Sequence, residues 1–497
     1  MKKYILKNLI LPLASRCTSN KGWDYYKHYI KADFDPVPLW RERQWQRLLN
    51  VLRHAYAHVP FYRSKYEKAG VRLDDIKNEA DFRRLPVITK KELRDNFPEN
   101  VIADNFSLEF LRYSNTSGTT GSSLILVNDQ DDINYKYASK LRSQYLMGCD
   151  IGDNIVRLTP NECQPCLPTG ESPDVGFYKY LKMLLSRHKF KRQAYYIFLE
   201  RYLINRFLNS RRFPPPLSPD LTDKELFNYV KVIQEFKPSI VAGYPVYLYL
   251  VAKYIQENRI SMPKCKCVDL TAGLSSSYMR GFIGEQFSAP VFQSYGGCEF
   301  GRVASSCEHD AGRMHILEEQ CYIEFIKNNG EPARQGQLAN IIITALNAYG
   351  MPVIRYEHGD VGEYFEEGCA CHRTTRLMQV AGRLHDLIIT SDGKLVPSRE
   401  ILEQFQGRFG IKLFQLIQHS NGEVDFKYVK ESAVVEINQD DIKMRLRMLL
   451  GDDVLINMQP LGFIQPAFSG KYRYVRSATY EPFRCVEDKK KALGNFW

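Results

Sequence analysis

The stretch Asn115-Thr116-Ser117-Gly118-Thr119-Thr120-Gly121-Ser122-Ser123 runs directly into the apolar segment Leu124-Ile125-Leu126-Val127. Its glycines allow a ligand to approach the backbone closely, and its hydroxyl and N–H groups can converge on anionic oxygens. No Gly-Lys-Ser/Thr sequence follows, so this is not a Walker A loop. Loops of this composition are more often plain turns, so the assignment of this loop to phosphate binding depends on other segments of the sequence. The candidate phosphate-binding residues are Ser117, Gly118, Thr119, Thr120 and Gly121.

Around this loop, strand-like and helix-like segments alternate, which predicts an α/β fold. Helical spacing within 40–70 should stop at Pro60, and short helices should flank Pro86. The basic, aromatic segment 176–212 also reads as helical, closed by the prolines from 214. The expected strands are Leu124–Val127, Ile240–Ala242, Cys267–Leu270, Val291–Ser294, Leu338–Thr344 and Leu387–Thr390.

The composition is that of a globular protein with more than one folded unit. The chain has 497 residues, of which 44% are hydrophobic and 25% charged, which excludes a miniprotein and long disorder. Twelve cysteines are too few for a disulfide scaffold at this length, so we expect reduced thiols or a metal site in a cytoplasmic protein. Lys7 and Asn8 interrupt the apolar start, which argues against secretion but leaves weak surface anchoring open.

The net charge of +11 is concentrated in two stretches. Residues 1–100 hold 21 basic and 12 acidic residues, and residues 176–212 hold 10 basic residues against one acidic residue. Such patches can serve nucleic acid, an anionic membrane or a polyphosphate ligand. A solvated helix face is the simpler interpretation, so nucleic acid is not an expected partner and peripheral membrane contact stays possible.

Several motifs, which occur in the order expected for the family, resemble the acyl-adenylate-forming superfamily. Within it, they resemble the phenylacetate–CoA ligase-like and capsular-polysaccharide-biosynthesis-type group. The resemblance extends from about Arg41 to Arg476. The matching segments are Leu49–Tyr62, Leu85–Lys90, Ser117–Gly121, Tyr295-Gly296-Gly297-Cys298-Glu299, Tyr356-Glu357-His358-Gly359-Asp360, Gly382-Arg383 and Gly470-Lys471.

The resemblance implies ATP-dependent activation of a carboxylic acid, aryl or similar, to acyl-AMP with pyrophosphate release, followed by transfer to CoA. It makes Lys471 the catalytic lysine and Glu299 the Mg²⁺ ligand, and both roles suit the chemistry of these groups. Tyr244 and Pro245 are expected to line the acyl pocket. The nucleotide-binding residues that it implies are Gly273, Tyr295, Gly296, Asp360 and Arg383.

The fold that the resemblance implies has a large α/β domain, residues 1–381, and a small mobile α+β lid, residues 382–497. The hinge would lie at His385 and Asp386. The family usually has Asp where this chain has His385, so pH-sensitive lid rotation near neutrality is a hypothesis. Ala272-Gly273-Leu274 also departs from the usual pattern and leaves the adenine contacts open.

Cys307, His315, Cys369 and Cys371 form a candidate structural Zn²⁺ site. Three thiolates and one imidazole make a closed tetrahedral set, and some phenylacetate–CoA ligase-like proteins look similar here. Free thiols are the alternative, and His309 or His372 could replace His315. Cys298, inside the Mg²⁺ motif, is expected to be a small buried side chain.

Two other functions stay open. The acceptor could be an amine, a hydroxyl or a sugar instead of CoA, which would make the chain an amide or ester ligase in polysaccharide or natural-product biosynthesis. A protein of another class would be a zinc-containing binder without catalysis. The sequence leaves open whether the protein is a monomer or a dimer.

Overall fold

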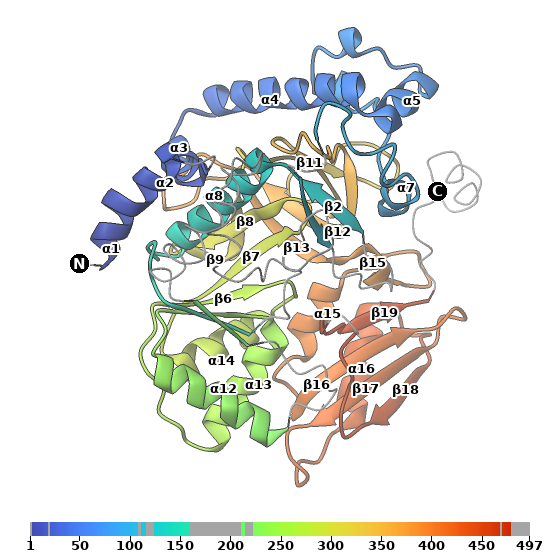
Figure 1. Cartoon of the computed structure of the whole chain (residues 1–497). Coiled ribbons are helices and arrows are strands. Elements are labelled where there is room, and N and C mark those ends of the chain that lie inside the picture. Colours follow the sequence, from blue (N-terminus) through green and yellow to red (C-terminus); the bar gives the residue numbers. More distant parts are fainter. Residues whose placement is uncertain are drawn as a thin grey trace.

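The computed structural model describes residues 2–17, 20–107, 111–115, 124–158, 210–213, 222–467 and 470–478. A mixed α/β body carries a smaller α+β unit at its C-terminal end, drawn in orange and red at the lower right of Figure 1. No helix in these ranges has both the length and the apolarity needed to cross a bilayer. The predicted fold class is confirmed.

An eleven-stranded sheet forms the centre of the body, in the order β10-β11-β12-β13-β9-β8-β7-β6-β5-β3-β4. The strands from β7 to β4 pair in parallel, whereas the others pair antiparallel. Their bounds are β3 Ile155–Leu158, β4 Ser210–Phe213, β5 Ile240–Gly243, β6 Cys267–Thr271, β7 Val291–Gly297, β8 Gly301–Cys307, β9 Asp310–Ile316, β10 Cys321–Ile326, β11 Ala339–Ala345, β12 Tyr356–Phe365 and β13 Leu377–Arg383. Completely buried strands such as β5 and β11 explain the continuous apolar runs in the sequence.

Helices cover this sheet. Capped starts define several of them: Thr222 and Glu225 form a capping box, and the Ser276 side chain accepts the Met279 N–H. The helices α12, α13 and α14 pack together below the parallel strands in Figure 1, and the long α4 crosses the top. The bounds are α3 Gly22–Ala32, α4 Val37–His58, α5 Pro60–Lys68, α6 Glu79–Phe82, α7 Lys90–Asp95, α8 Gln130–Leu146, α12 Asp223–Phe236, α13 Pro245–Glu257 and α14 Ser277–Phe287.

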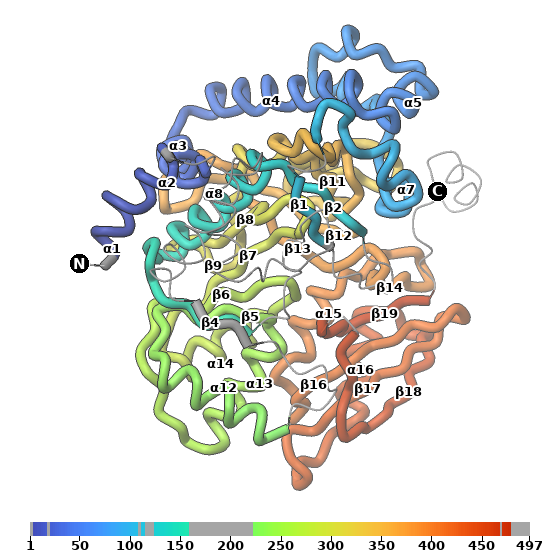
Figure 2. Tube along the Cα trace, in the orientation of Figure 1, coloured from blue at the N-terminus to red at the C-terminus, as the bar shows by residue number. Residues whose placement is uncertain are grey.

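The C-terminal unit has its own four-stranded sheet, in the order β18-β17-β16-β19. Its strand β16 is central and β19 returns parallel to it, which closes the unit at the end of the described chain (Figure 2). The bounds are η5 Leu384–Asp386, β14 Ile388–Ile389, β15 Leu395–Val396, α15 Ser398–Phe405, β16 Ile411–Gln418, β17 Val424–Lys430, α16 Gln439–Leu450, β18 Ile456–Pro460 and β19 Val475–Ser477.

Most expected elements are present. A helix ends before Pro60, and this proline then occupies the first turn of α5, where its missing N–H costs nothing. One expectation was wrong at its end: residues 210–212, expected in a helix, belong to strand β4, which pairs in parallel with β3. The rest of segment 176–212 lies outside the described residues.

Candidate active site

Three segments with predicted site residues follow the C-terminal ends of parallel strands. Tyr244 and Pro245 follow β5, Gly273 follows β6, and Tyr295 and Gly296 lie at the end of β7. Since parallel strands end at the same edge of a sheet, the fold gathers these segments on one side. Ligands of open α/β sheets bind at this edge, so the topology alone points to a ligand site here.

The hairpin β7–β8 turns tightly through the Glu299 motif. A Cβ on Gly296 would come 2.0 Å from the Gly301 carbonyl oxygen, so only glycine fits where the two strands close. The Glu299 side chain is buried, and its Oε2 lies over Gly297 together with Nε2 of His358. A buried carboxylate oxygen at this edge has the chemistry of a Mg²⁺ ligand. Cys298, expected to be buried, is exposed because it occupies the tip of the hairpin.

Asp360 sits at the centre of a hydrogen-bonded group on β12. The Tyr295 hydroxyl donates to Asp360 Oδ2 at 2.9 Å, and His358 Nδ1 lies 2.6 Å from the same oxygen. Arg383 is the register partner of Asp360 on β13, and its Nε is 3.7 Å from Oδ1. Burial raises the pKa of this carboxyl, but His358, Arg383 and the Tyr295 hydroxyl outweigh burial and hold it well below its usual range. Asp360 is therefore an ionised acceptor facing the strand ends.

His358 is a site residue that the sequence reasoning overlooked. It stands two positions before Asp360, on the same face of the strand, which is the signal that could have identified it. Burial works against the charged imidazole, but Asp360 and Glu299 outweigh it and raise the pKa of His358. The imidazole thus links the two acidic residues of the site.

Lys90 is a second overlooked residue. Ile88 of its segment bridges to Tyr356, which brings the start of α7 beside β12. Burial lowers the pKa of Lys90. The nearby Arg383 and Arg94 lower this pKa further, whereas Glu299 acts in the opposite direction. A lysine in the first turn of a helix interacts unfavourably with the helix dipole. This unfavourable position is the sequence feature that could have identified Lys90 as a site residue.

Lys471 reaches the same place from the C-terminal unit. Burial and the nearby Arg383 lower the pKa of Lys471, while Asp360, Cys298 and Glu299 act in the opposite direction. Gly470, directly before this lysine, has a φ of 73°, and the Ala467 N–H donates to the Lys471 carbonyl at 2.8 Å. The structure therefore brings the predicted lysine together with Glu299 and Asp360, which belong to the other unit.

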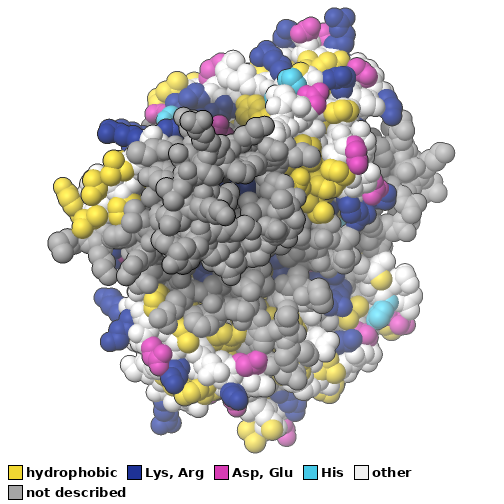
Figure 3. Space-filling view, viewed as in Figure 1, with side chains coloured by type: hydrophobic (Ala, Val, Ile, Leu, Met, Phe, Trp, Pro, Cys, Tyr) yellow, Lys and Arg dark blue, Asp and Glu magenta, His cyan; other side chains and the backbone are white. Residues whose placement is uncertain are grey.

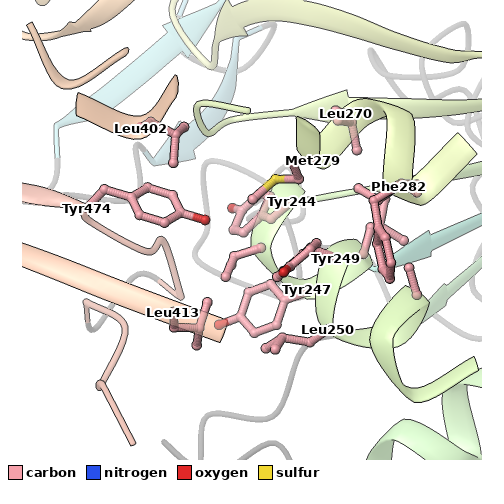
Figure 4. Close-up of a cluster of buried hydrophobic side chains, with 14 of the residues drawn as sticks. Tyr244, Tyr247, Tyr249, Leu250, Leu270, Met279, Phe282, Leu402, Leu413 and Tyr474 are labelled. Atoms are coloured by element: carbon pink, nitrogen blue, oxygen red, sulfur yellow. The ribbon is translucent and has the colours of Figure 1, made fainter. Parts of the chain in front are cut away.

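A tyrosine-rich surface on α13 holds this arrangement. The Tyr247 hydroxyl donates to the Gly470 carbonyl at 2.8 Å. Figure 4 shows Leu413 and Tyr474 of the C-terminal unit facing Tyr247 and Tyr249 of α13, and all four belong to one buried cluster. Apolar burial across this contact stabilises the orientation in which Lys471 faces the sheet.

The predicted acyl-pocket residues lie beside the predicted nucleotide residue. Tyr244 caps the start of α13 and is buried, and Pro245 occupies its first turn. A Cβ on Gly273 would be 3.1 Å from Pro245 Cδ, so the two segments touch, and Ala272 adopts a φ of 60° to make this turn. Pro245 and Gly273 thus form adjoining parts of one surface.

At the predicted hinge, Gly382 has a φ of 148° and packs against Ser398. Asp386 is buried and ion-paired with Arg473. Burial lowers the pKa of His385, with Arg473 and Arg383 acting in the same direction, and this shift runs away from neutrality. The histidine therefore gives little support to pH-sensitive rotation between pH 6 and 8.

The four candidate zinc ligands meet. Their donor atoms, from Cys307, His315, Cys369 and Cys371, all lie within 4.8 Å of one another. Sγ of Cys307 and Cys369 are 3.6 Å apart, close to the edge of about 3.8 Å of a tetrahedron with ~2.3 Å Zn–S bonds. Nδ1 of His315 contacts the Thr375 hydroxyl, which leaves Nε2, 3.2 Å from the Cys371 Sγ, for a metal.

The electrostatics of His315 also fit a ligand. Burial, with Arg373 and Arg142 nearby, lowers its pKa to about 3, so the ring is in the neutral form that binds metals. The donor set therefore fits Zn²⁺. The site ties β8 and β9 to the segment before β13.

The predicted phosphate loop, Ser117–Gly121, lies outside the described residues. Its flanking strands, β1 Arg112–Asn115 and β2 Ile125–Asn128, pair antiparallel as a hairpin. The loop therefore connects two paired strands, and its contacts stay a prediction.

The comparisons with known proteins agree with these motifs. Residues 388–478 match the family model of the CapK C-terminal domain. The chain is 23% identical to phenylacetate-coenzyme A ligase of Thermus thermophilus over 84% of this chain and 85% of that protein. It is 21% identical to Protein CapK of Staphylococcus aureus, over 80% and 81% of the two chains.

A crystal structure of 2-hydroxyisobutyryl-CoA ligase in the postadenylation state, in complex with 2-HIB-AMP, covers 93% of both chains with a TM-score of 0.66 and 18% identity. That likeness shows the fold. Together, the matches confirm the resemblance to the phenylacetate–CoA ligase-like and CapK group, and they support an AMP-forming acid–CoA ligase.

Proposed function

We propose that this protein activates a carboxylic acid of aryl or similar type with ATP, forms the acyl-AMP, and passes the acyl group to CoA. The observation that carries the proposal is the meeting of Lys471 with Asp360 and Glu299 at the C-terminal ends of the parallel strands. A cation supplied by one structural unit and two acids supplied by another suit a nucleotide whose phosphate reacts between them.

Each group has a task in the first half-reaction. A carboxylate oxygen of the acid attacks the α-phosphorus, and pyrophosphate leaves with the electrons of the broken P–O bond. Lys471 stabilises the negative charge that develops on the α-phosphate. Asp360, kept ionised by its neighbours, accepts hydrogen bonds from the ribose hydroxyls, with Tyr295 and Arg383 fixing its orientation. Ser117, Gly118, Thr119, Thr120 and Gly121 bind the remaining phosphates.

Glu299 has the donor chemistry to hold Mg²⁺, and that ion would neutralise phosphate charge during the transfer. Gly273 and Gly296, at the ends of β6 and β7, would border the nucleotide, and Tyr244 and Pro245, at the start of α13, would border the acyl group. The Cys307, His315, Cys369 and Cys371 cluster would hold Zn²⁺ as a structural ion, because a closed set of four protein ligands leaves no open position for catalysis.

The second half-reaction requires the lid to move. We place the domain boundary at residue 382 and the hinge at His385 and Asp386, because β13 ends at Arg383 and separate sheets follow it. After rotation, the CoA thiolate attacks the acyl carbonyl and AMP leaves. No disulfide occurs among the described cysteines, which is in keeping with a cytoplasmic site of action.

A pyrophosphate-release screen over aryl, alkyl and amino acids, with and without CoA, tests the proposal. We expect acid-dependent pyrophosphate release that continues through multiple turnovers only when CoA is present. Release that is indifferent to CoA but stimulated by an amine, hydroxyl or sugar would replace it with an amide or ester ligase. No release with any acid would overturn it in favour of a binding protein.

A further inference from the structure

We propose that the N-terminal helical segment, residues 2–17, docks on an anionic lipid surface through a face made of Tyr4, Leu9 and Leu13. These side chains are 72%, 54% and 48% exposed. The segment runs as α1 Lys2–Ile5, the π-helical η1 Leu6–Ile10 and α2 Leu11–Cys17. Figure 3 shows hydrophobic side chains gathered over this segment at the left edge of the molecule.

A π-helical turn places two apolar stripes on opposite sides of the N-terminal helical segment. The Leu11 N–H bonds to the Leu6 carbonyl, so a step of five residues stays on one side of the helix there. Tyr4 and Leu9 are five residues apart, and Leu13 follows Leu9 by one α-helical turn, so the three align. The opposite stripe, made of Leu6, Ile10, Leu11 and Ala14, is buried in one cluster with Trp23, Tyr26 and Tyr29.

Two ion pairs hold the exposed face outward. Lys3 pairs with Asp153 and Lys7 pairs with Asp150, both in the segment before β3. With the buried stripe packed on the body and both lysines ion-paired to it, Tyr4, Leu9 and Leu13 stay exposed among the described residues. A rigidly presented apolar face loses little conformational entropy when it docks.

The charge around this face fits an anionic surface. No acidic residue occurs before Asp24, and residues 2–41 hold eight basic against three acidic residues. Arg16, Lys21 and Lys31 are exposed among them. Phe34 and Leu39, each 48% exposed, are further exposed apolar side chains around the start of α4. Apolar side chains bordered by lysine and arginine are typical of helices that lie in the bilayer interface.

Co-sedimentation with phosphatidylcholine vesicles, with and without phosphatidylglycerol, tests the proposal without an activity assay. Wild type should bind the vesicles that contain phosphatidylglycerol and be released by salt. The triple variant Tyr4→Ser, Leu9→Ser, Leu13→Ser should lose about tenfold or more of its partition coefficient. The matched control Met444→Ser, Met448→Ser, Leu455→Ser removes side chains of the C-terminal unit that are 56%, 72% and 66% exposed, and it should bind like wild type.

Equal binding by the triple variant, or no binding of wild type to anionic vesicles, would overturn the proposal. So would a wild-type dimer that the triple variant abolishes, because the face would then be an interface between two copies. If the triple variant does not fold, Tyr4→Trp keeps the face apolar. Its added fluorescence should be quenched by brominated anionic lipid, and unchanged fluorescence would contradict docking.

Discussion

The Tyr247 hydroxyl donates a 2.8 Å hydrogen bond to the carbonyl of Gly470, the residue directly before Lys471. Tyr247 lies in the first turn of α13, the helix that begins at the proposed acyl-pocket residues Tyr244 and Pro245. The helix that borders the acid therefore also holds the lysine loop. This link connects two segments that lie 223 residues apart in the chain.

Tyr247→Phe should slow the first half-reaction by about fivefold, because the lost hydrogen bond is worth ~1 kcal/mol and holds the loop in the orientation that brings Lys471 to Asp360 and Glu299. Thioester formation from preformed acyl-AMP should keep its rate. Tyr254→Phe is the matched control on the same helix, since no hydrogen bond of its hydroxyl occurs within the described residues. Single-turnover rates of both steps check this, and equal slowing of both would show that Tyr247 does not act through the lysine loop.

Gly297→Ala should impair activity more than stability. A Cβ at this position would lie 2.6 Å from Glu299 Oε2 and 3.0 Å from His358 Nε2, so one or both side chains must move. We expect a drop of about tenfold or more in kcat/KM for ATP, since a displaced group of this kind contributes several kcal/mol to transition-state stabilisation.

Gly281→Ala is its control, because a Cβ there meets nothing within 4 Å and the residue lies in α14. That substitution should preserve the kinetics and raise thermal stability slightly. Unchanged ATP kinetics in Gly297→Ala would show that the Glu299 and His358 geometry does not matter for the reaction.

The protein as purified should contain one zinc per chain, and Cys371→Ser should lose it. Removing one thiolate of a closed four-ligand set weakens metal binding strongly, and the folding free energy supplied by the metal is lost with it. Cys298→Ser, which alters an exposed thiol outside the cluster, should keep full metal content. Elemental analysis of zinc content and measurement of Tm test this prediction. A metal-free wild type, together with an unchanged Tm in Cys371→Ser, would mean that the cluster consists of thiols without a metal.

Arg473→Ala should destabilise the protein by about 3 kcal/mol near neutral pH, because it leaves the buried Asp386 carboxylate without its partner. Burial raises the pKa of Asp386 above its unfolded value, although Arg473 acts to lower this pKa. A raised folded-state pKa means that the folded protein binds the proton more tightly. The deficit should therefore shrink as the pH falls from 7 toward 5.

Adding Asp386→Asn to Arg473→Ala removes the titrating group, so the pH dependence of the deficit should disappear. Urea unfolding at several pH values measures both effects. A deficit that stays constant with pH in the single variant would mean that Asp386 does not carry it.

Local sequence patterns predicted the helices and strands whose formation depends on their own residues. The apolar runs at Ile240–Ala242 and Val291–Ser294 became strands because both faces of the sheet are covered, and Pro60 separated two helices because its ring cannot continue the first one. The cysteines and His315 were predicted as one cluster from ligand chemistry, and the fold brings them together.

Relationships between distant segments were not predictable in the same way. Arg211 and Arg212 end a basic segment that was predicted to be helical, but residues 210–212 pair with β3 as a strand. Sequence periodicity does not show pairing with a distant segment. His358 escaped notice because its role depends on Glu299 from another hairpin. The Tyr247–Gly470 bond likewise arises only when the two units pack together.

The rate of the first half-reaction in Lys471→Ala tests the central claim most directly. With a responsive acid, ATP–pyrophosphate exchange should fall by about 10²–10³-fold, because one preorganised charge at the reacting phosphate is lost. Thioester formation from supplied acyl-AMP should persist, and Lys443→Ala, on α16, should leave both rates unchanged. Exchange at the wild-type rate in Lys471→Ala would contradict the account.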